Sequence, residues 1–168
     1  MLYKCYYNSP IGKLTLFSNG TSLIGLQLEN PKYDLKLNEE PIVNKELKIF
    51  KEVSNWLDKY FKGENPNPHI LKLEPNGSKF QKEVWKILRT IPYGETTTYG
   101  KIAKQIGSKN NTKMSAQAVG GAISRNKIAI IIPCHRVIGQ NNRLTGYAGG
   151  LNIKVKLLEL EGTKVIKL

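Results

Sequence analysis

The residues with the clearest capacity for chemistry are a cysteine and a histidine side by side, Cys134 and His135, at the end of an apolar run. Residues 128–132 are rich in isoleucine, which is typical of a buried strand, and Pro133 ends the run. A neighbouring imidazole can take the thiol proton, directly or through one water, and leave the thiolate that is the nucleophilic form of sulfur. The pair therefore indicates a nucleophilic cysteine. The alternative is an inert core cysteine beside a buried structural histidine.

The few residues that could bind a soft metal share no recognisable spacing. The chain has only two cysteines, Cys5 and Cys134, and two histidines, His69 and His135. We expect no structural metal, no cofactor and no disulfide. The first residues lack the regions of a signal peptide, and no apolar stretch nears the length that spans a bilayer. We therefore expect a cytoplasmic protein.

The positive charge is concentrated in the second half of the chain. The net charge is +13 over 168 residues. Residues 1–77 hold 10 Lys and Arg against 9 Asp and Glu, whereas residues 78–168 hold 16 against 4. Such asymmetry indicates a polyanionic partner, either nucleic acid or an anionic membrane surface, and the same half carries Cys134. A generally lysine-rich composition would have raised the charge of both halves.

The first half has the pattern of a small antiparallel sheet followed by a helix. Strands are predicted at residues 2–7, around residues 14–16 and at residues 23–28, with turns at residues 9–12 and at Asn19-Gly20. Residues 30–43 are predicted to form a loop, and a helix is expected from Lys45 to near Gly63. Residues 69–73 are predicted to form a short closing strand. We place a domain boundary at residues 74–77, which predicts domains 1–77 and 78–168.

The second half predicts a series of short helices. Ser78 with Gln81 forms a capping-box pattern for the first of these helices, and Thr98 caps a second that spans residues 99–106 and ends at Gly107. A third is expected from Ser115 to about Arg125, and a last from residue 151 to 160, whose inward residues would be Leu151, Val155, Leu157 and Leu158. The second and third helices resemble a helix-turn-helix unit. An ordinary helical bundle without a ligand is the alternative; the charge favours DNA.

Two features of these helices call for a partner. The third helix carries small residues, Ala116, Ala118, Gly120, Gly121 and Ala122, which offer no hydrogen bond to a base edge. Small side chains permit close approach, either in tight core packing or in sequence-indifferent contact with DNA. Glu161 ends the last helix, where the macrodipole disfavours a carboxylate. That carboxylate is therefore either solvated or paired with a cation such as a histidine.

The segment Ile132-Pro133-Cys134-His135-Arg136-Val137 resembles the active-site signature of the O6-alkylguanine-DNA alkyltransferases, also called methylated-DNA–protein-cysteine methyltransferases. The resemblance extends from about Phe80 to Gly162 and includes four further segments, which are Tyr93-Gly94-Glu95 with Tyr99, Ala118 to Ala122 with Asn126, Tyr147-Ala148-Gly149-Gly150-Leu151, and Glu161-Gly162. Over residues 1–77 it concerns the general layout only.

The resemblance implies an α/β (α+β) fold, with a ribonuclease-H-like first domain and a winged-helix-like second domain that contains the helix-turn-helix. It implies a monomeric, single-turnover repair protein that flips O6-alkylguanine, and by extension O4-alkylthymine, out of double-stranded DNA and moves the alkyl group to Cys134. The implied catalytic residues are Cys134, His135, Glu161, Asn126 and Tyr99. The implied substrate-binding residues are Val137, Tyr147, Ala148 and Gly149, and the DNA-binding residues are Thr98, Ala116, Gln117, Ala118, Gly120, Gly121, Arg125 and Arg136.

One departure concerns the contact with the base stack. Many relatives carry an arginine that enters the stack where the extruded nucleotide was, and this chain has Gln117 there.

Three alternative functions stay open on sequence grounds: a lesion-flagging module without transfer, a winged-helix transcription factor in which Cys134 is a core thiol, and a thiol hydrolase. Members of the first class lack the cysteine, so Cys134 speaks against it.

Overall fold

The computed structural model describes residues 1–164, and their contacts divide the chain into two compact units. The first comprises residues 1–76 together with 127–129, and the second comprises residues 77–126 and the chain from residue 130 onward. The sequence-based boundary after residue 77 did not anticipate that residues 127–129 belong with the first unit. Within the described residues, no helix is long and apolar enough to cross a membrane.

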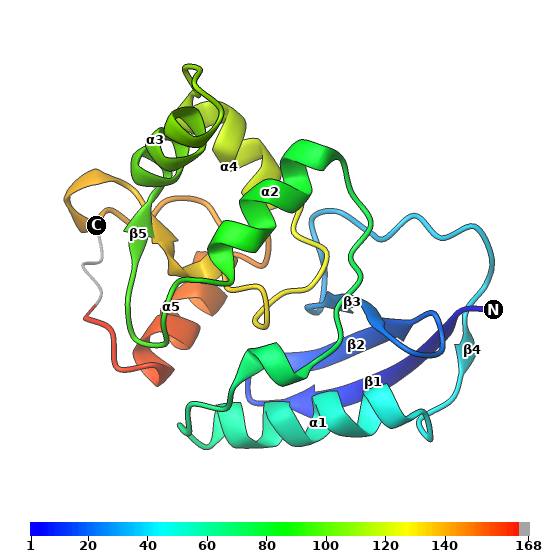
Figure 1. The fold of residues 1–168 in the computed structure, drawn as a ribbon. Helices are drawn as coiled ribbons and strands as arrows, with labels where there is room; N and C mark the ends of the chain where they lie inside the picture. Colours follow the sequence, from blue (N-terminus) through cyan, green and yellow to red (C-terminus); the bar gives the residue numbers. More distant parts are fainter. Residues whose placement is uncertain (165–168) are drawn as a thin grey trace. The chain divides into compact units, whose positions relative to one another are not determined.

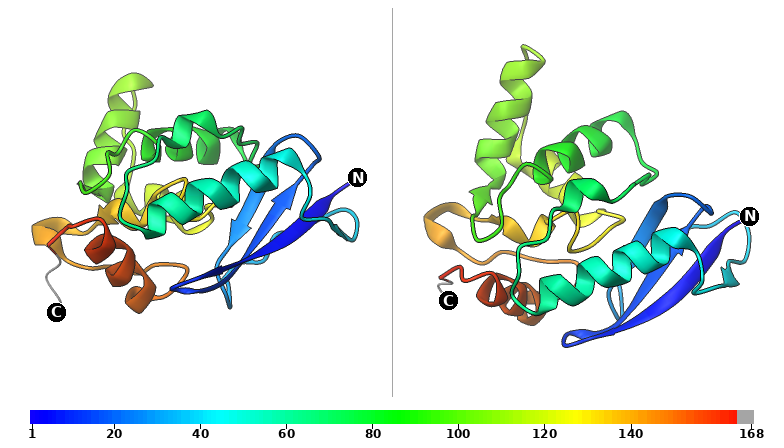
Figure 2. Two further views of the ribbon diagram at one scale, coloured as in Figure 1. Left: turned by 90° about the horizontal axis from the view of Figure 1, so that it is seen from below. Right: turned by 60° about the horizontal axis from the view of Figure 1, so that its bottom comes forward.

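The first unit is a four-stranded sheet with one helix against it (Figure 1). The strand order is β3-β2-β1-β4, with β1 (Tyr3–Ser9), β2 (Gly12–Ser18) and β3 (Leu23–Gln27) antiparallel and β4 (Ile42–Val43) parallel to β1. The long helix α1 (Lys48–Phe61) runs along the sheet in both views of Figure 2. Alternation along β2 buries Leu14 and Leu16 in this core, and α1 contributes Phe50 from its apolar stripe.

Three details of the first unit differ from the sequence-based expectation. The helix begins at Lys48 rather than Lys45. The segment read as loop supplies the two-residue strand β4. The predicted strand at residues 69–73 is wrong over most of its length, since Pro68–Ile70 is the 3-10 turn η1 and only Leu73 bridges to the sheet, at Leu23. A two-residue edge strand carries too little periodicity to be read from sequence.

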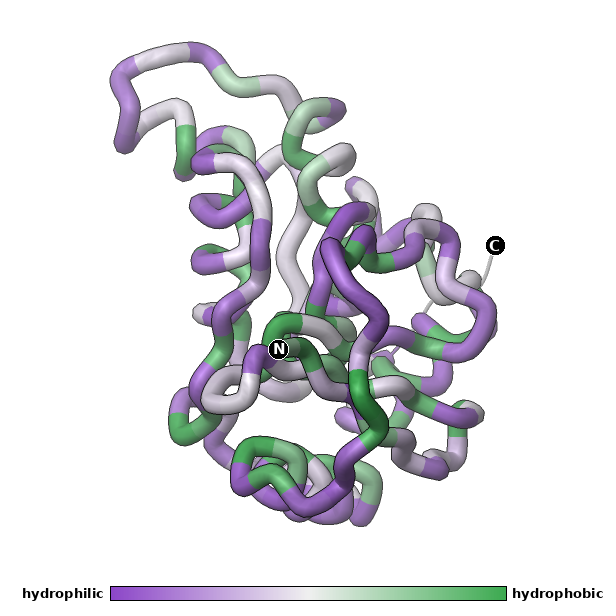
Figure 3. The backbone as a smooth tube through the Cα atoms, turned by 90° about the vertical axis from the view of Figure 1, so that its right-hand side faces the viewer, coloured by the Kyte–Doolittle hydropathy of each residue, from purple (hydrophilic) through white to green (hydrophobic). Residues whose placement is uncertain are grey.

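The second unit is built on three helices that pack on one another, α2 (Lys79–Leu88), α3 (Tyr99–Lys109) and α4 (Ala116–Ser124). The capping box at Ser78 and Gln81 and the cap at Thr98 are as predicted. The Ser115 hydroxyl caps α4, which therefore begins at Ala116 rather than at Ser115. Trp85 of α2 is buried and donates from Nε1 to the Ala122 carbonyl. Hydrophilic and hydrophobic bands alternate along the helical backbone in Figure 3.

The remaining elements of the second unit bring the chemically interesting residues together. The 3-10 turn η2 (Cys134–Arg136) leads into β6 (Val137–Ile138), which pairs in parallel with β5 (Thr97–Thr98). A further 3-10 turn, η3 (Gln140–Asn142), and the helix α5 (Leu151–Leu160) follow. Because β5 runs directly into α3, this pairing places the first residue of α3, Tyr99, near the turn that holds Cys134.

Three expectations for the second unit are corrected. Residues 128–132 are buried but form no strand: Ile128 bridges to Leu26 of the first unit's sheet, and Ile130 has a φ of 71°, which an extended strand does not allow. The helix α3 passes through Gly107, whose lack of a side chain serves close packing, since a Cβ would lie 2.6 Å from the Thr112 carbonyl. Leu151, expected inside, is 46% exposed.

The predicted fold class is confirmed. A sheet-bearing first unit precedes a helical second unit, and α2, α3 and α4 include the pair of capped helices expected of a helix-turn-helix.

Candidate active site around Cys134

Cys134 is presented by a turn that backbone and amide hydrogen bonds close. Pro133 has φ −82° and ψ 67°, and Cys134 N donates to Ile132 O over 2.8 Å, which is the geometry of an inverse γ-turn. Arg136 N donates to Pro133 O, and the Asn126 amide donates to Ile132 O over 2.8 Å. The proline that ends the isoleucine run in the sequence therefore fixes the direction in which the cysteine leaves it.

The sulfur of Cys134 has polar neighbours although the residue is only 6% exposed. Asn126 Nδ2 lies 3.2 Å from Sγ and donates toward it. Burial raises the pKa of the Cys134 thiol, whereas hydrogen bonds from Asn126 and Tyr147 and the charge of Lys154 oppose that rise in pKa. Each opposing group favours the negatively charged sulfur. A base that removes the proton would therefore leave a thiolate with stabilising partners.

His135 is held by a buried carboxylate. Its Nε2 lies 2.6 Å from Glu161 Oε2, and both side chains are fully buried. The pKa of Glu161 is low, so the carboxylate is ionised and the shared proton sits on Nε2. Nδ1 of the neutral ring then carries the lone pair, and no residue in the described part of the chain hydrogen-bonds to it. Burial lowers the pKa of His135, so the ring is neutral and able to accept a proton.

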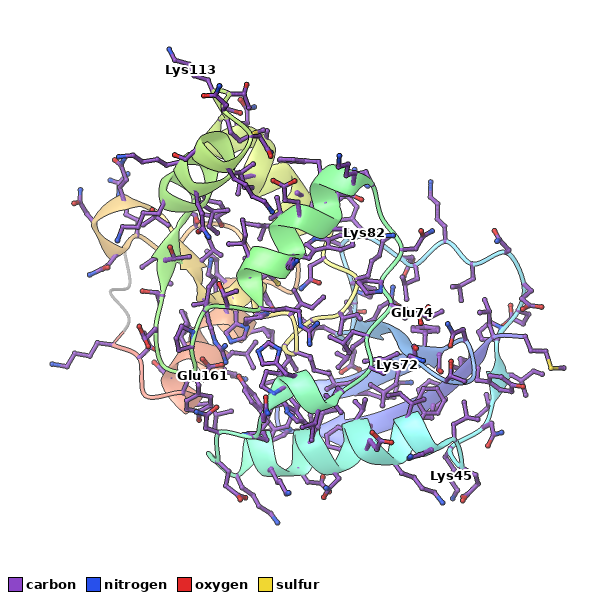
Figure 4. The ribbon with its side chains drawn as sticks, viewed as in Figure 1. Lys45, Lys72, Glu74, Lys82, Lys113 and Glu161 are labelled. Carbon is purple, nitrogen blue, oxygen red and sulfur yellow. The ribbon has the colours of Figure 1, made fainter. Side chains whose placement is uncertain are left out.

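Glu161, which lies at the end of α5 (Figure 4), has the histidine partner expected from its unfavourable place on the macrodipole, and Arg136 as a cationic partner as well. Arg136 Nε donates to Oε1 over 2.8 Å, and Gly94 N donates to the same oxygen over 3.3 Å. Burial acts to raise the pKa of the carboxyl group, but His135 and Arg136 together lower this pKa to about 2. The carboxylate thus holds the histidine in one tautomer and one orientation.

The assignment of Arg136 to DNA binding is corrected. Its guanidinium is buried, with Nε on Glu161, Nη1 on the Ile91 carbonyl over 2.7 Å, and the ring of Tyr93 beside it. A charge engaged in this way is not available to a phosphate. The signature motif places arginine next to histidine, and only the fold shows that both side chains turn inward to one carboxylate.

Lys154 was missed, although the sequence held a signal. Its side chain is fully buried, and Nζ donates to Val137 O over 2.6 Å and to Thr145 O over 3.2 Å. Burial lowers the pKa of Lys154 to about 8, against the opposing effect of Cys134. The residue precedes Leu157 and Leu158 by three and four positions, which puts a lysine on the apolar face of α5. Among residues 1–164 no carboxylate pairs with Lys154, and a buried lysine held only by carbonyls is rare and calls for a reason.

Of the residues expected to bind a base, Val137 and Tyr147 lie at the same turn. The Val137 side chain is buried, its N–H donates to Cys134 O and its carbonyl accepts from Lys154. Tyr147 reaches Cys134, and Ala148 and Gly149 follow it in a partly exposed segment. Tyr99 is partly exposed, and its hydroxyl lies 3.1 Å from Thr145 Oγ1. Thr145 had not been singled out, because no pattern in the sequence ties it to Tyr99.

The helix α4 exposes the small residues that were expected to face DNA. Its inward residues are Val119, Ala122 and Ile123, so Ala122 belongs to the core. The residues Ala116, Gln117, Ala118 and Gly121 are exposed, Gly120 is partly exposed, and exposed Arg125 ends the helix. A Cβ at Gly121 would meet nothing within 4 Å, so no contact within the described chain requires a glycine there. Thr98 uses its hydroxyl to cap α3.

A basic hollow lies beside these residues. The groove between α3 and the start of α4 has a volume of about 710 Å³ and is open to solvent. Its lining includes Lys104, Lys113 and the backbone around Ala116. The Lys113 side chain extends outward from the turn between the two helices (Figure 4). This face therefore combines the positive charge of two lysines with the small exposed residues of α4.

Comparison with known proteins gives matches over nearly the whole chain. Residues 2–75 match the ribonuclease-like domain of 6-O-methylguanine DNA methyltransferase, and residues 79–163 match the DNA binding domain of the same protein. A methylated-DNA–protein-cysteine methyltransferase of Methanosarcina acetivorans is 48% identical over 162 residues, which is 96% of this chain and 99% of that protein. The Haemophilus influenzae protein of the same name is 42% identical over 160 residues, 95% of this chain and 86% of its own length.

Solved structures agree with the sequence matches. The Mycobacterium tuberculosis OGT in complex with DNA has a TM-score of 0.80 and 43% identity, and the alignment covers 95% of this chain and 92% of that one. The Mycobacterium tuberculosis O6-methylguanine methyltransferase has a TM-score of 0.78 at 42% identity, with 96% and 93% covered. Models of the two domains of 6-O-methylguanine DNA methyltransferase match both units, and the Methanosarcina acetivorans relative is 48% identical over nearly its full length. The chain therefore belongs to the 6-O-methylguanine DNA methyltransferase family.

Proposed function

We propose that this protein repairs O6-alkylguanine in double-stranded DNA by moving the alkyl group onto Cys134, once per molecule. Repair of DNA by alkyl transfer is the activity of its family, and a relative has been solved with DNA bound. The observation that carries the assignment to Cys134 is its surroundings, with a hydrogen-bond donor on the sulfur and, next in the chain, a histidine that is paired with the buried Glu161 at the end of α5. We further propose that the protein acts as a monomer in the cytoplasm.

The nucleophile is generated within the turn. His135 takes the Cys134 proton on Nδ1, through a bridging water, and becomes an imidazolium that Glu161 stabilises. Arg136 neutralises part of the negative charge of Glu161. The carboxylate therefore orients the imidazole ring but does not keep it in the doubly protonated form before the reaction. Asn126 donates to the resulting thiolate, which favours the charged form.

The transfer is a displacement at the saturated carbon of the alkyl group. A sulfur lone pair forms the new S–C bond while the C–O bond breaks, and its electron pair stays with O6 of guanine. The proton that His135 took from the thiol is passed on to guanine, so one thiol and one O6-alkylguanine become one thioether and one guanine. A thioether has no leaving group comparable to guanine, and the protein therefore turns over once.

The damaged base enters between the Cys134 turn and the segment after η3. We assign Tyr147 as one wall, the backbone at Cys134, Val137 and Ala148 as the hydrogen-bonding edge, and Gly149 as room for the alkyl group. The exposed face of α4 would lie against the duplex. Its small residues allow close approach without base readout, which suits lesions that occur in any sequence.

Gln117 sits where an inserting side chain would be needed to fill the gap left by the flipped base. Glutamine has the length but no charge. Gln117→Arg should tighten binding to an O6-methylguanine duplex several-fold, because a charge adds phosphate attraction. The measurement is a fluorescence titration at fixed salt, and equal or weaker binding would remove the inserting role from this position.

The decisive experiment is intact-protein mass spectrometry after incubation with a duplex that contains one O6-methylguanine. The wild-type protein should gain one methyl group, and peptide mapping should place it on Cys134. The Cys134→Ala variant should bind the duplex and gain nothing, whereas Cys5→Ala should gain the methyl group as the wild type does. Binding without any gain in the wild type would favour a lesion-flagging module or a transcription factor and would overturn the proposal.

A further inference from the structure

Thr145 occupies a fixed position beside the phenol that faces the reacting base. Its Oγ1 lies 3.1 Å from Tyr99 Oη. The backbone carbonyl of the same residue accepts from the buried ammonium of Lys154, which also holds Val137 O on the other side of the loop. The hydroxyl is therefore carried by a backbone that is tied down independently of Tyr99.

The glycine at position 139 fixes the remaining side of Thr145. A Cβ at Gly139 would lie 2.9 Å from Thr145 Cγ2. The threonine methyl group therefore occupies the space that a side chain at position 139 would need. The loop closes there through Gly139 N, which donates to Arg143 O over 2.8 Å. With the methyl group against Gly139 and the carbonyl on Lys154, the Thr145 hydroxyl is directed to Tyr99.

Each of the two hydroxyl groups has one proton, and only one proton can lie between the two oxygens. If Tyr99 donates to Thr145, no phenolic proton is left for a bound base. If Thr145 donates to Tyr99, the phenolic proton is free, and the phenol becomes a better donor because hydrogen bonds in a chain polarise one another. A purine that develops negative charge as the alkyl group leaves is a stronger acceptor than an alcohol. A bound purine therefore favours the arrangement in which Thr145 donates to Tyr99 and Tyr99 donates to the base.

We propose that Thr145 is a positioning residue of the alkyl transfer, which donates to Tyr99 so that the Tyr99 proton is directed at the departing guanine. The inference rests on the proposed function and extends it to the leaving-group side of the reaction. As the C–O bond breaks, its electron pair moves onto guanine, and the phenolic proton is shared with or passed to the base. Tyr99 is then reprotonated by the proton that Cys134 gave up, so no further reactant is needed.

The ionisation of Tyr99 agrees with this arrangement. Burial raises the pKa of Tyr99, which keeps the phenol protonated and able to donate at neutral pH, and the hydrogen bond from Thr145 lowers the same pKa. Nearby charge comes from Cys134, whose thiolate raises the pKa of Tyr99. Lys154 donates a hydrogen bond to the Thr145 carbonyl in the same loop.

The test compares two methyl donors that differ in the leaving group. Both use the same thiolate, but guanine needs a hydrogen-bond donor as it leaves and iodide does not. In a Cys5→Ala background, single-turnover rates are measured with an O6-methylguanine duplex and with methyl iodide. Thr145→Val, which keeps the shape and removes the donor, should slow transfer from DNA about tenfold and leave the methyl iodide rate within about twofold. Thr145→Ser should restore transfer from DNA.

A double-variant cycle keeps the result independent of folding defects. Because Thr145 acts through Tyr99, Thr145→Val should add no further loss in a Tyr99→Phe background. Equal rates for Thr145→Val and the parent protein on DNA would overturn the inference, as would an equal slowing with both methyl donors or full additivity with Tyr99→Phe. Failure of the parent protein to take a methyl group from DNA would instead overturn the proposed function.

Discussion

The two cysteines of this protein are both buried, yet only one lies in surroundings that suit chemistry. Cys5, in β1 of the first unit, is 4% exposed, and burial alone raises the pKa of its thiol to about 11. Burial also raises the pKa of Cys134, but Asn126, Tyr147 and Lys154 act against it. Burial by itself makes a thiol inert, so a nucleophile in a closed site needs donors and cations around the sulfur. Variants at and around the two cysteines test that difference.

Removing the base should have the largest effect. His135→Ala deletes the acceptor for the Cys134 proton, so the single-turnover rate on an O6-methylguanine duplex should fall by about 100-fold or more, within the range for general base catalysis. Binding of the duplex by the same variant, measured by gel shift, should stay within about twofold. A rate close to that of the wild type would show that Cys134 loses its proton without His135.

The amide beside the sulfur should matter next. Asn126→Ala removes the donor to Sγ and leaves the Ile132 carbonyl without this donor. Transfer should slow about tenfold, and unfolding in urea should show a loss of about 0.5–1.5 kcal/mol for the lost hydrogen bond to Ile132 O, which keeps Cys134 N as a donor. Asn126→Asp is the matched control, because a carboxylate of the same size repels the thiolate. Transfer by the aspartate variant at the wild-type rate would contradict the stated role of the donor.

The carboxylate behind His135 should make the Cys134 region sensitive to acid. The pKa of Glu161 is lowered from 4.5 to about 2, so the folded state binds this proton less tightly than the unfolded chain. The stabilisation is present above about pH 4.5 and is lost as pH falls toward 2. Thermal melts between pH 6 and 3 should therefore flatten in Glu161→Gln relative to the wild type. The same slope in both proteins would assign the acid sensitivity to other groups.

Changing the inert cysteine should have the smallest effect. Cys5→Ala should lower the free energy of unfolding by about 1 kcal/mol, because it trades a buried sulfur for a small cavity. The single-turnover rate should not change, since nothing at Cys5 contributes to the site. Quantitative mass spectrometry over a time course would detect a difference, and a tenfold slower transfer would mean that the first unit acts on the chemistry.

Sequence patterns predicted the parts of the structure that depend on local interactions. The capping box at Ser78 and Gln81, the bounds of α5 and the histidine partner of Glu161 follow from residues a few positions apart or from the unfavourable place of a carboxylate at a helix C-terminus. Lys154, Arg136 and Thr145 could not be placed in the same way. Their partners are a main-chain carbonyl, a carboxylate shared with another residue, and a phenol 46 residues away.

The isoleucine run shows where a correct local pattern gives the wrong structure. Its composition correctly predicts burial, but the unusual φ of Ile130 and the Asn126 amide turn the chain instead of extending it. Hydrophobicity specifies which residues leave water and does not specify the path between them. The path is set by a side chain that lies outside the run.

The turn that holds Cys134 is closed by neutral groups, namely the Ile132 and Pro133 carbonyls and one amide side chain. The sulfur passes through three forms during its single use: a thiol, an anion and a thioether. None of the bonds that shape the turn depends on which form is present, so the scaffold has little reorganisation to perform as the charge appears and vanishes. A reagent that is spent on its first encounter can in this way be held ready without a moving part.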